Sequence, residues 1–175
     1  MNFKETKLTG VFEITLERKT DERGFFARTW CRQEFAEHGL DSTLVQASIS
    51  YNTRKGTLRG MHFQIAPFEE TKLIRCTRGA IYDVILDLRK NSRTFKEWIA
   101  SELTAENRNM LFVPKGCAHG FLTLQDNTEV FYQMSEVFDT ASVRGVRWND
   151  PSFKIDWPEK VEVITEKDRN YADFQ

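Results

Sequence analysis

The stretch LRGMHFQ, residues 58–64, combines residue types that could bind a phosphate and transfer a proton. Arg59 carries a fixed positive charge, and His62 is one of three histidines in the chain. Side chains alternate between the two faces of a strand, so Arg59 and His62 would point to opposite faces of a regular strand. Gly60 lies where a bend or bulge is easiest, and a bend there would let both side chains serve one pocket. An ordinary strand with a surface arginine and a hydrogen-bonded histidine is the alternative.

Further side chains that could complete such a site are Lys72, His119, Tyr132 and Asp168. A lysine on the inward face of a strand is costly unless it is paired or functional, and a buried tyrosine hydroxyl needs a partner. His119 lies in a loop that a proline and glycines restrict, on the approach to another strand. Each has a structural reading as well: Lys72 could reach solvent, Tyr132 could serve packing alone, and Thr165 and Asp168 have the spacing of a helix capping box.

Strands must position these side chains, because the dominant hydrophobic period is two residues. The run AIYDVILDLRK alternates over residues 80–90. Further runs of β type, separated by turn signals, cover residues 72–76, 110–114, 120–124 and 129–135. One short helix is expected over 32–39, closed by Gly39, and the last residues could hold one or two more helical turns. Many short strands predict a single all-β domain over residues 1–175, a jelly-roll sandwich or barrel with a few short helices.

Composition and charge exclude several classes of protein. Lys and Arg number 25 against 26 Asp and Glu, so nucleic acid is not expected as the main partner, because binding a phosphate backbone needs a basic excess. No stretch is long and apolar enough to span a membrane, and the charged N-terminus lacks the apolar run of a secretory signal. Cys31, Cys76 and Cys117 are widely spaced, which predicts free thiols in a reducing compartment. We therefore expect a cytoplasmic protein.

Seven motifs, in order along the chain, resemble those of the nucleotide-sugar 3,5-epimerases, typified by the dTDP-4-dehydrorhamnose 3,5-epimerases. They are DERGFF (21–26), KGTLRGMHFQ (55–64), KLIRCTRGAIYDVILDLRKNSRTF (72–95), PKGCAHGFLTL (114–124), EVFYQMS (129–135), GVRWNDPSFKIDWP (145–158) and TEKD (165–168). A lone LRGxH would be weakly specific, whereas the ordered set is highly specific. The resemblance implies a cupin-type jelly roll, a homodimer with exchanged N-terminal strands, and no metal or other cofactor.

The resemblance also implies roles for the residues that match these motifs. His62 matches the base, Asp168 the carboxylate that orients it, Tyr132 the acid on the opposite face of the sugar, and Lys72 the group beside the ketone oxygen. Residues implied to bind the nucleotide diphosphate sugar are Arg23, Phe26, Arg28, Gln46, Ser48, Arg59, His119 and Lys167. A ketone at C4 of the sugar acidifies the neighbouring C–H bonds. Inversion at C3, C5 or both then needs a base on one face and an acid on the other.

Four positions depart from the family's usual pattern. Arg28 and Ser48 stand where Glu and Asn are usual, and Val143 or a neighbour replaces another Glu. Phe138 stands where the family often has Tyr. The first three surround the nucleotide or its sugar in the family, so the same chemistry on a CDP- or other nucleotide-linked sugar is an alternative to dTDP. Phe138 could influence which carbon centres are inverted.

Two other classes of function are open. A metal-dependent cupin enzyme could use His62, His119 and Glu69 or Glu70 as a set of two histidines and one carboxylate. The usual HxH motif of such sites is absent, however, because His-Phe-Gln stands in its place. The second class is a non-catalytic module that binds sugar nucleotides. It predicts binding without exchange of substrate hydrogen with solvent.

Overall fold

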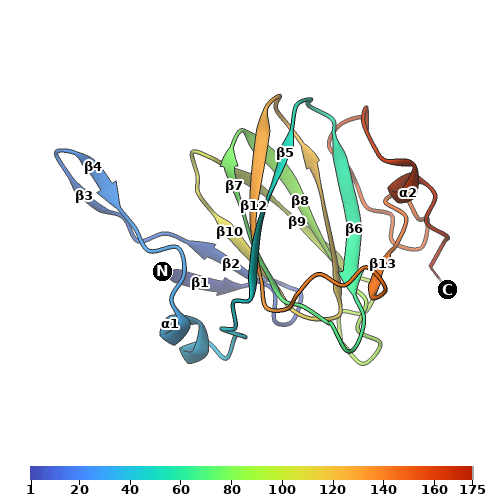
Figure 1. Ribbon diagram of the computed structural model, residues 1–175, viewed down its shortest axis with the longest axis horizontal. Coiled ribbons are helices and arrows are strands. Elements are labelled where there is room, and N and C mark those ends of the chain that lie inside the picture. Colours follow the sequence, from blue (N-terminus) through green and yellow to red (C-terminus); the bar gives the residue numbers. More distant parts are fainter. Residues whose placement is uncertain (175) are drawn as a thin grey trace.

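Two antiparallel sheets pack face to face in the computed structural model, which describes residues 1–174 (Figure 1). The six-stranded sheet consists, in spatial order, of β1 (Asn2–Glu5), β2 (Phe12–Thr15), β10 (Met110–Val113), β7 (Lys72–Arg78), β12 (Thr128–Met134) and β5 (Gln46–Asn52). The five-stranded sheet consists of β13 (Val143–Gly145), β6 (Leu58–Gln64), β11 (Cys117–Thr123), β8 (Ala80–Asp87) and β9 (Trp98–Thr104). The all-β, jelly-roll-like sandwich predicted from the alternating pattern is confirmed.

The remaining elements lie outside the two sheets. Strands β3 (Lys19–Asp21) and β4 (Gly24–Phe26) form a hairpin that stands well away from the body of the molecule (Figure 1). Helices α1 (Arg32–Glu37) and α2 (Glu166–Arg169) are short, and both fall where the sequence predicted helical turns. Neither helix of the described part of the chain is long and apolar enough to cross a membrane.

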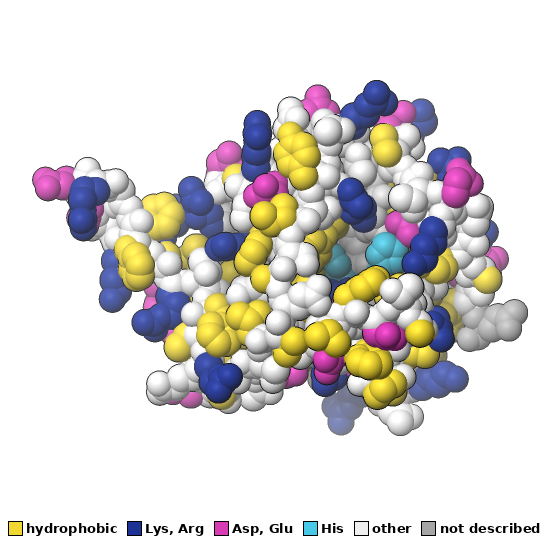
Figure 2. Space-filling view, viewed as in Figure 1, with side chains coloured by type: hydrophobic (Ala, Val, Ile, Leu, Met, Phe, Trp, Pro, Cys, Tyr) yellow, Lys and Arg dark blue, Asp and Glu magenta, His cyan; other side chains and the backbone are white. Residues whose placement is uncertain are grey.

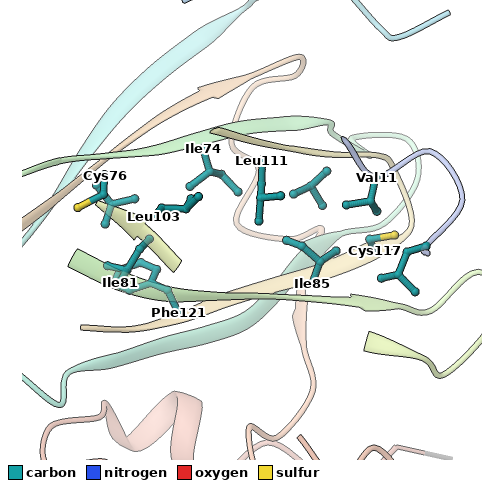
Figure 3. Close-up of a cluster of buried hydrophobic side chains, with 12 residues drawn as sticks. Val11, Ile74, Cys76, Ile81, Ile85, Leu103, Leu111, Cys117 and Phe121 are labelled. Carbon is teal, nitrogen blue, oxygen red and sulfur yellow. The ribbon is translucent and has the colours of Figure 1, made fainter. Parts of the chain in front are cut away.

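Both faces of β8 are buried, because the strand carries apolar side chains on both sides. Ile81 and Ile85 point into the space between the sheets, where they meet side chains from β7, β10 and β11 (Figure 3). Val84 and Leu86 point the other way and pack with residues of the C-terminal segment. Burying an aliphatic side chain of this size contributes about 1.5–3 kcal/mol. The apolar contacts on both faces therefore hold β8 firmly as a central strand of its sheet.

The predicted strands over 72–76, 110–114 and 129–135 are confirmed by β7, β10 and β12. The strand predicted to begin at Gly120 begins instead at Cys117, so placing His119 in a loop was wrong. The reason is that Cys117, His119 and Phe121 share one strand parity and are all buried facing the other sheet. Pro114 and Gly116 precede the strand, and they did not prevent it from beginning as early as Cys117.

The expected bend in β6 is present, and it depends on a close approach between two glycines. Gly60 has a φ of +143°, and a Cβ placed there would lie 2.5 Å from the Cα of Gly120 on β11. The pairing of β6 with β11 shifts register in the same place, between His119 and Phe121. As a result, Arg59 and His62 both line one cavity although regular alternation would separate them.

We expect Gly60→Ala to lower the free energy of unfolding by about 3 kcal/mol or more, because backbone strain adds to overpacking against β11. Gly39→Ala is the matched control: it also has a positive φ, +69°, but its Cβ would meet nothing within 4 Å. The free energy of unfolding of that variant should fall by only about 1–2 kcal/mol. Urea unfolding of both variants measures the difference, and equal losses would contradict a role for the close approach.

Candidate active site

A cavity of about 480 Å³ opens between the two sheets and collects most of the predicted site residues. Those that line it are Gln46, Ser48, Arg59, His62, Lys72, His119, Tyr132, Lys167 and Asp168. Figure 2 shows histidine side chains in a hollow of this face, with basic side chains around it. Strands of both sheets contribute to the lining, so a molecule in the cavity would have one sheet on each side.

His62 and Asp168 form a hydrogen-bonded pair although they are 106 positions apart in the chain, with 2.7 Å between Nε2 and Oδ1. Helix α2 brings the carboxylate to β6, and Thr165 caps this helix by accepting a hydrogen bond from the Asp168 backbone N–H. Asp168 therefore belongs to the helix cap through its backbone N–H and pairs with His62 through its side chain. Burial opposes ionisation of Asp168, but hydrogen bonds from His62, from the Gly60 N–H and within the cap outweigh it and lower its pKa.

The pairing determines which nitrogen of His62 is free to act. An ionised carboxylate can only accept a hydrogen bond, so the Nε2 atom of His62 donates to Asp168. In the neutral ring the lone pair then lies on Nδ1, which is the nitrogen available to take a proton. The imidazole is partly exposed, whereas the carboxylate behind it is almost fully buried. This is the arrangement expected of an oriented general base.

Tyr132 faces this pair from the other sheet, on β12. As its parity predicted, it lies on the inward face with Val130, which is fully buried. Burial raises the pKa of the Tyr132 phenol, and the negative charge of Asp83 raises it further, while Arg59 and the Ser50 hydroxyl act in the opposite direction. The phenol therefore keeps its proton at neutral pH and is available as an acid.

Lys72 enters the cavity from the start of β7 and does not extend into solvent. Its ammonium group lies 3.2 Å from a carboxylate oxygen of Glu70, and both side chains are largely buried. Glu70, one of the carboxylates considered as a metal ligand, is thus occupied by Lys72. Residues 1–174 contain no group of three or more His, Cys, Asp or Glu side chains placed to hold a metal ion. A buried ammonium can stabilise a negatively charged oxygen formed beside it.

His119 is held by Asp83, a residue that the sequence reading did not assign to the site. The Nε2 atom of His119 lies 2.7 Å from Oδ1 of Asp83, and Asp83 is completely buried on β8. Burial raises the pKa of Asp83, although His119 and Lys72 act against this. A signal was present: a charged residue on the same face as Ile81 and Ile85 interrupts an apolar run, and buried charges require partners.

Three predicted binding residues lie outside the cavity of their own chain. Arg23 is on the β3–β4 hairpin, where its side chain is 84% exposed and its guanidinium pairs with Asp21. Phe26, on the same hairpin, is 72% exposed. Arg28 pairs with Glu34 of α1 at 2.8 Å. Within the single chain these side chains are therefore not brought to the other predicted site residues.

The other positions that depart from the family pattern do line the cavity, namely Ser48, Phe138 and Val143. Phe138 is 61% exposed, so its ring presents a large apolar surface to solvent. The amide oxygen of Gln46 accepts a hydrogen bond from the Phe138 backbone N–H at 2.9 Å. Gln46 thus fixes the segment that carries Phe138.

Comparison with known proteins identifies the family of this chain. A family model described as dTDP-4-dehydrorhamnose 3,5-epimerase matches residues 5–175. A protein of that name from Methanothermobacter thermautotrophicus is 45% identical over 172 residues, which span 97% of this chain and 92% of that protein. The Bacillus anthracis dTDP-4-dehydrorhamnose 3,5-epimerase, whose crystal structure has TDP and PPi bound, is 40% identical in sequence. The two structures match with a TM-score of 0.94 over 99% of each chain.

A third relative was crystallised with a sugar nucleotide. It is the dTDP-6-deoxy-D-glucose-3,5-epimerase of Legionella pneumophila in complex with dTDP-4-keto-L-rhamnose, 32% identical with a TM-score of 0.88 over 95% of this chain and 89% of that one. Sequence and structure agree over nearly the whole length in each comparison. The chain belongs to the dTDP-4-dehydrorhamnose 3,5-epimerase family.

Proposed function

We propose that this protein epimerises a dTDP-linked 4-keto-6-deoxyhexose at C3 and C5, converting dTDP-4-dehydro-6-deoxyglucose to dTDP-4-dehydrorhamnose. One observation carries the proposal: His62 on one sheet, paired with Asp168 of α2, lies across a single cavity from Tyr132 on the other sheet. Inversion at carbon requires proton removal from one face and proton delivery to the other. The dTDP sugar in the Legionella relative supports dTDP over another nucleotide.

Each inversion breaks one C–H bond and forms another on the opposite face. Nδ1 of His62 takes the proton from the carbon beside the C4 ketone, and the electron pair moves onto the ketone oxygen to give an enolate. The Lys72 ammonium stabilises that oxygen. Tyr132 then gives its phenol proton to the other face of the same carbon, after which solvent removes the proton from His62 and restores that of Tyr132. No electrons are gained or lost, so the step needs no redox cofactor.

The non-reacting part of the substrate would occupy the rest of the cavity. Arg59 contacts the diphosphate in this proposal, because a guanidinium fork fits phosphate oxygens. Gln46, Ser48 and Lys167 contact the nucleotide or sugar, and His119 contacts a sugar hydroxyl. All of them line the same cavity as the acid and the base.

We also propose that the active form is a homodimer. The outer face of β5 exposes Ile49 and Tyr51, and the hairpin exposes Phe26, which leaves apolar surface for a partner to cover. Strands β1 and β2 pair with each other within the chain. We therefore assign the exchange of N-terminal strands between chains, which the resemblance implies, to the β3–β4 hairpin. It would carry Arg23 to the partner's cavity. Three free cysteines support a reducing, cytoplasmic location.

Deuterium exchange separates the acid from the base. In D2O, Tyr132→Phe should still incorporate deuterium, because His62 can form the enolate and return a deuteron to the same face, while inverted product falls by roughly a hundredfold or more. His62→Ala should lose exchange at both C3 and C5 by about 10²–10⁴-fold. NMR of the recovered sugar measures both. Parallel loss of exchange and inversion in well-folded Tyr132→Phe would contradict the assignment of the acid.

The lowered pKa of Asp168 makes its contribution to stability depend on pH. The stabilisation is present above the unfolded pKa of about 3.9 and is lost as the pH falls through the folded pKa. We expect Asp168→Asn to lower the free energy of unfolding by about 1–3 kcal/mol at pH 7, with the deficit shrinking below about pH 4. The exposed Asp156→Asn is the control and should change stability by less than about 0.5 kcal/mol. A deficit that stays constant down to pH 3 would exclude the ionised carboxylate as its source.

Mixed dimers test the hairpin exchange. Arg23→Ala should raise KM, because it contacts a part of the substrate that does not react, and His62→Ala should be inactive. A heterodimer of the two has one site with both His62 and a partner's Arg23 intact. Differently tagged chains, co-expressed and purified as heterodimers, should therefore regain about half of the wild-type activity per dimer at low substrate concentration. If Arg23 acted in its own chain, one site of the heterodimer would lack Arg23 and the other would lack His62. The heterodimer would then be no more active than a single Arg23→Ala site.

A further inference from the structure

Asn52, the last residue of β5, makes a contact that joins the two sheets beside the cavity. Its Oδ1 atom accepts a hydrogen bond of 2.7 Å from Nε of Arg59, which is on β6 of the opposite sheet. Asn52 is only 3% exposed. A buried amide must satisfy both its oxygen and its nitrogen, so this side chain can hold only one orientation if its partners are fixed.

Those partners are fixed, because they belong to the backbone of the six-stranded sheet. Nδ2 of Asn52 lies 3.3 Å from the carbonyl oxygen of Thr128 and 3.3 Å from that of Ser50. It also lies 3.5 Å from the Ser50 hydroxyl. Carbonyl oxygens only accept, so the nitrogen faces them and the oxygen is left to face Arg59. The sheet thereby determines where the acceptor for Arg59 lies.

The bond to Nε controls how Arg59 presents its charge. When the guanidinium is held only through Nε, its two terminal nitrogens remain free. They can then make a bidentate contact with phosphate oxygens. The acceptor is a neutral amide, and within residues 1–174 no carboxylate forms an ion pair with Arg59. Asn52 therefore restrains the side chain without cancelling its positive charge, which a carboxylate in the same place would do.

The same restraint keeps a positive charge near the acid. Arg59, Ser50 and Tyr132 line one cavity, and the charge of Arg59 lowers the pKa of the Tyr132 phenol against the larger effect of burial. A tyrosinate left after proton donation is stabilised by a cation held in place. Orientation of Arg59 thus matters to both the bound phosphate and the reacting end of the site.

We propose that Asn52 is a positioning residue, which aims the Arg59 guanidinium at the substrate diphosphate while leaving its charge intact. This inference rests on the proposed function, in which Arg59 contacts the diphosphate. It assigns to Asn52 an effect that acts through Arg59 alone, and that makes it separable from a general contribution to folding.

A double-mutant cycle tests this dependence, with dTDP as the probe and isothermal titration calorimetry as the readout. Asn52→Leu should weaken dTDP binding by about tenfold, as for loss of a hydrogen bond to a charged group. Arg59→Met should weaken it at least as much. The double variant should bind dTDP as Arg59→Met does, because the effect of Asn52 disappears when Arg59 is absent. Asn52→Ser, a smaller polar replacement that is too short to reach Nε, should repeat the result if the leucine variant folds poorly.

Ser92→Ala is the matched control, since it removes a hydrogen bond to a buried carboxylate outside the cavity and should leave dTDP binding unchanged. Unchanged dTDP binding in Asn52→Leu and Asn52→Ser would overturn the inference. So would an equal loss in the wild-type and Arg59→Met backgrounds, because it would show a structural effect independent of Arg59. Tight dTDP binding by a wild-type protein that fails to exchange substrate hydrogen would overturn the proposed epimerase but not the role of Asn52.

Discussion

The approach of Gly60 to Gly120 is the constraint on which the site depends. Two strands can come this close only where neither carries a side chain, since a Cβ on either glycine would lie under 3 Å from the opposite strand. The approach bends β6, and the bend turns Arg59 and His62 toward the same cavity. It also brings the backbone N–H of Gly60 to the carboxylate of Asp168, which pairs with His62. Backbone geometry, and not only side-chain identity, therefore brings the proposed catalytic groups together.

Inversion also requires an acid and a base on opposite sides of the substrate, and the two-sheet architecture can provide this. The proposed base, His62, comes from β6 and the proposed acid, Tyr132, comes from β12, and these strands belong to different sheets. A planar enolate held between the sheets would present one face to each. Burial then sets the protonation states: the phenol on β12 retains its proton, while hydrogen bonds keep the carboxylate behind His62 ionised. The two-sheet architecture thus places the proposed acid and the proposed base on opposite sides of one cavity.

Much of this could be predicted from the sequence, and the reasons are physical. The period-two pattern predicted β7, β8, β10 and β12, because alternation of apolar residues is a local property. The inward direction of Tyr132 followed from the same parity. The pairing of His62 with Asp168 did not, since it joins residues 106 positions apart and was implied only by resemblance to a family. The roles of Asp83 and Asn52 did not follow from the sequence either, because hydrogen bonds between strands depend on the register of the strands.

The position of the hairpin has a consequence for how an active molecule matures. Each chain can complete both sheets by itself, because β1 through β13, apart from β3 and β4, pair within the two sheets of one protomer. The hairpin gains a binding surface only when a second chain arrives in the dimer we propose. In that case folding of the sandwich would be unimolecular, whereas completion of the nucleotide site would be bimolecular and would slow as protein concentration falls. Newly made chains would pass through a folded stage that has its acid and base in place before it can hold its substrate firmly.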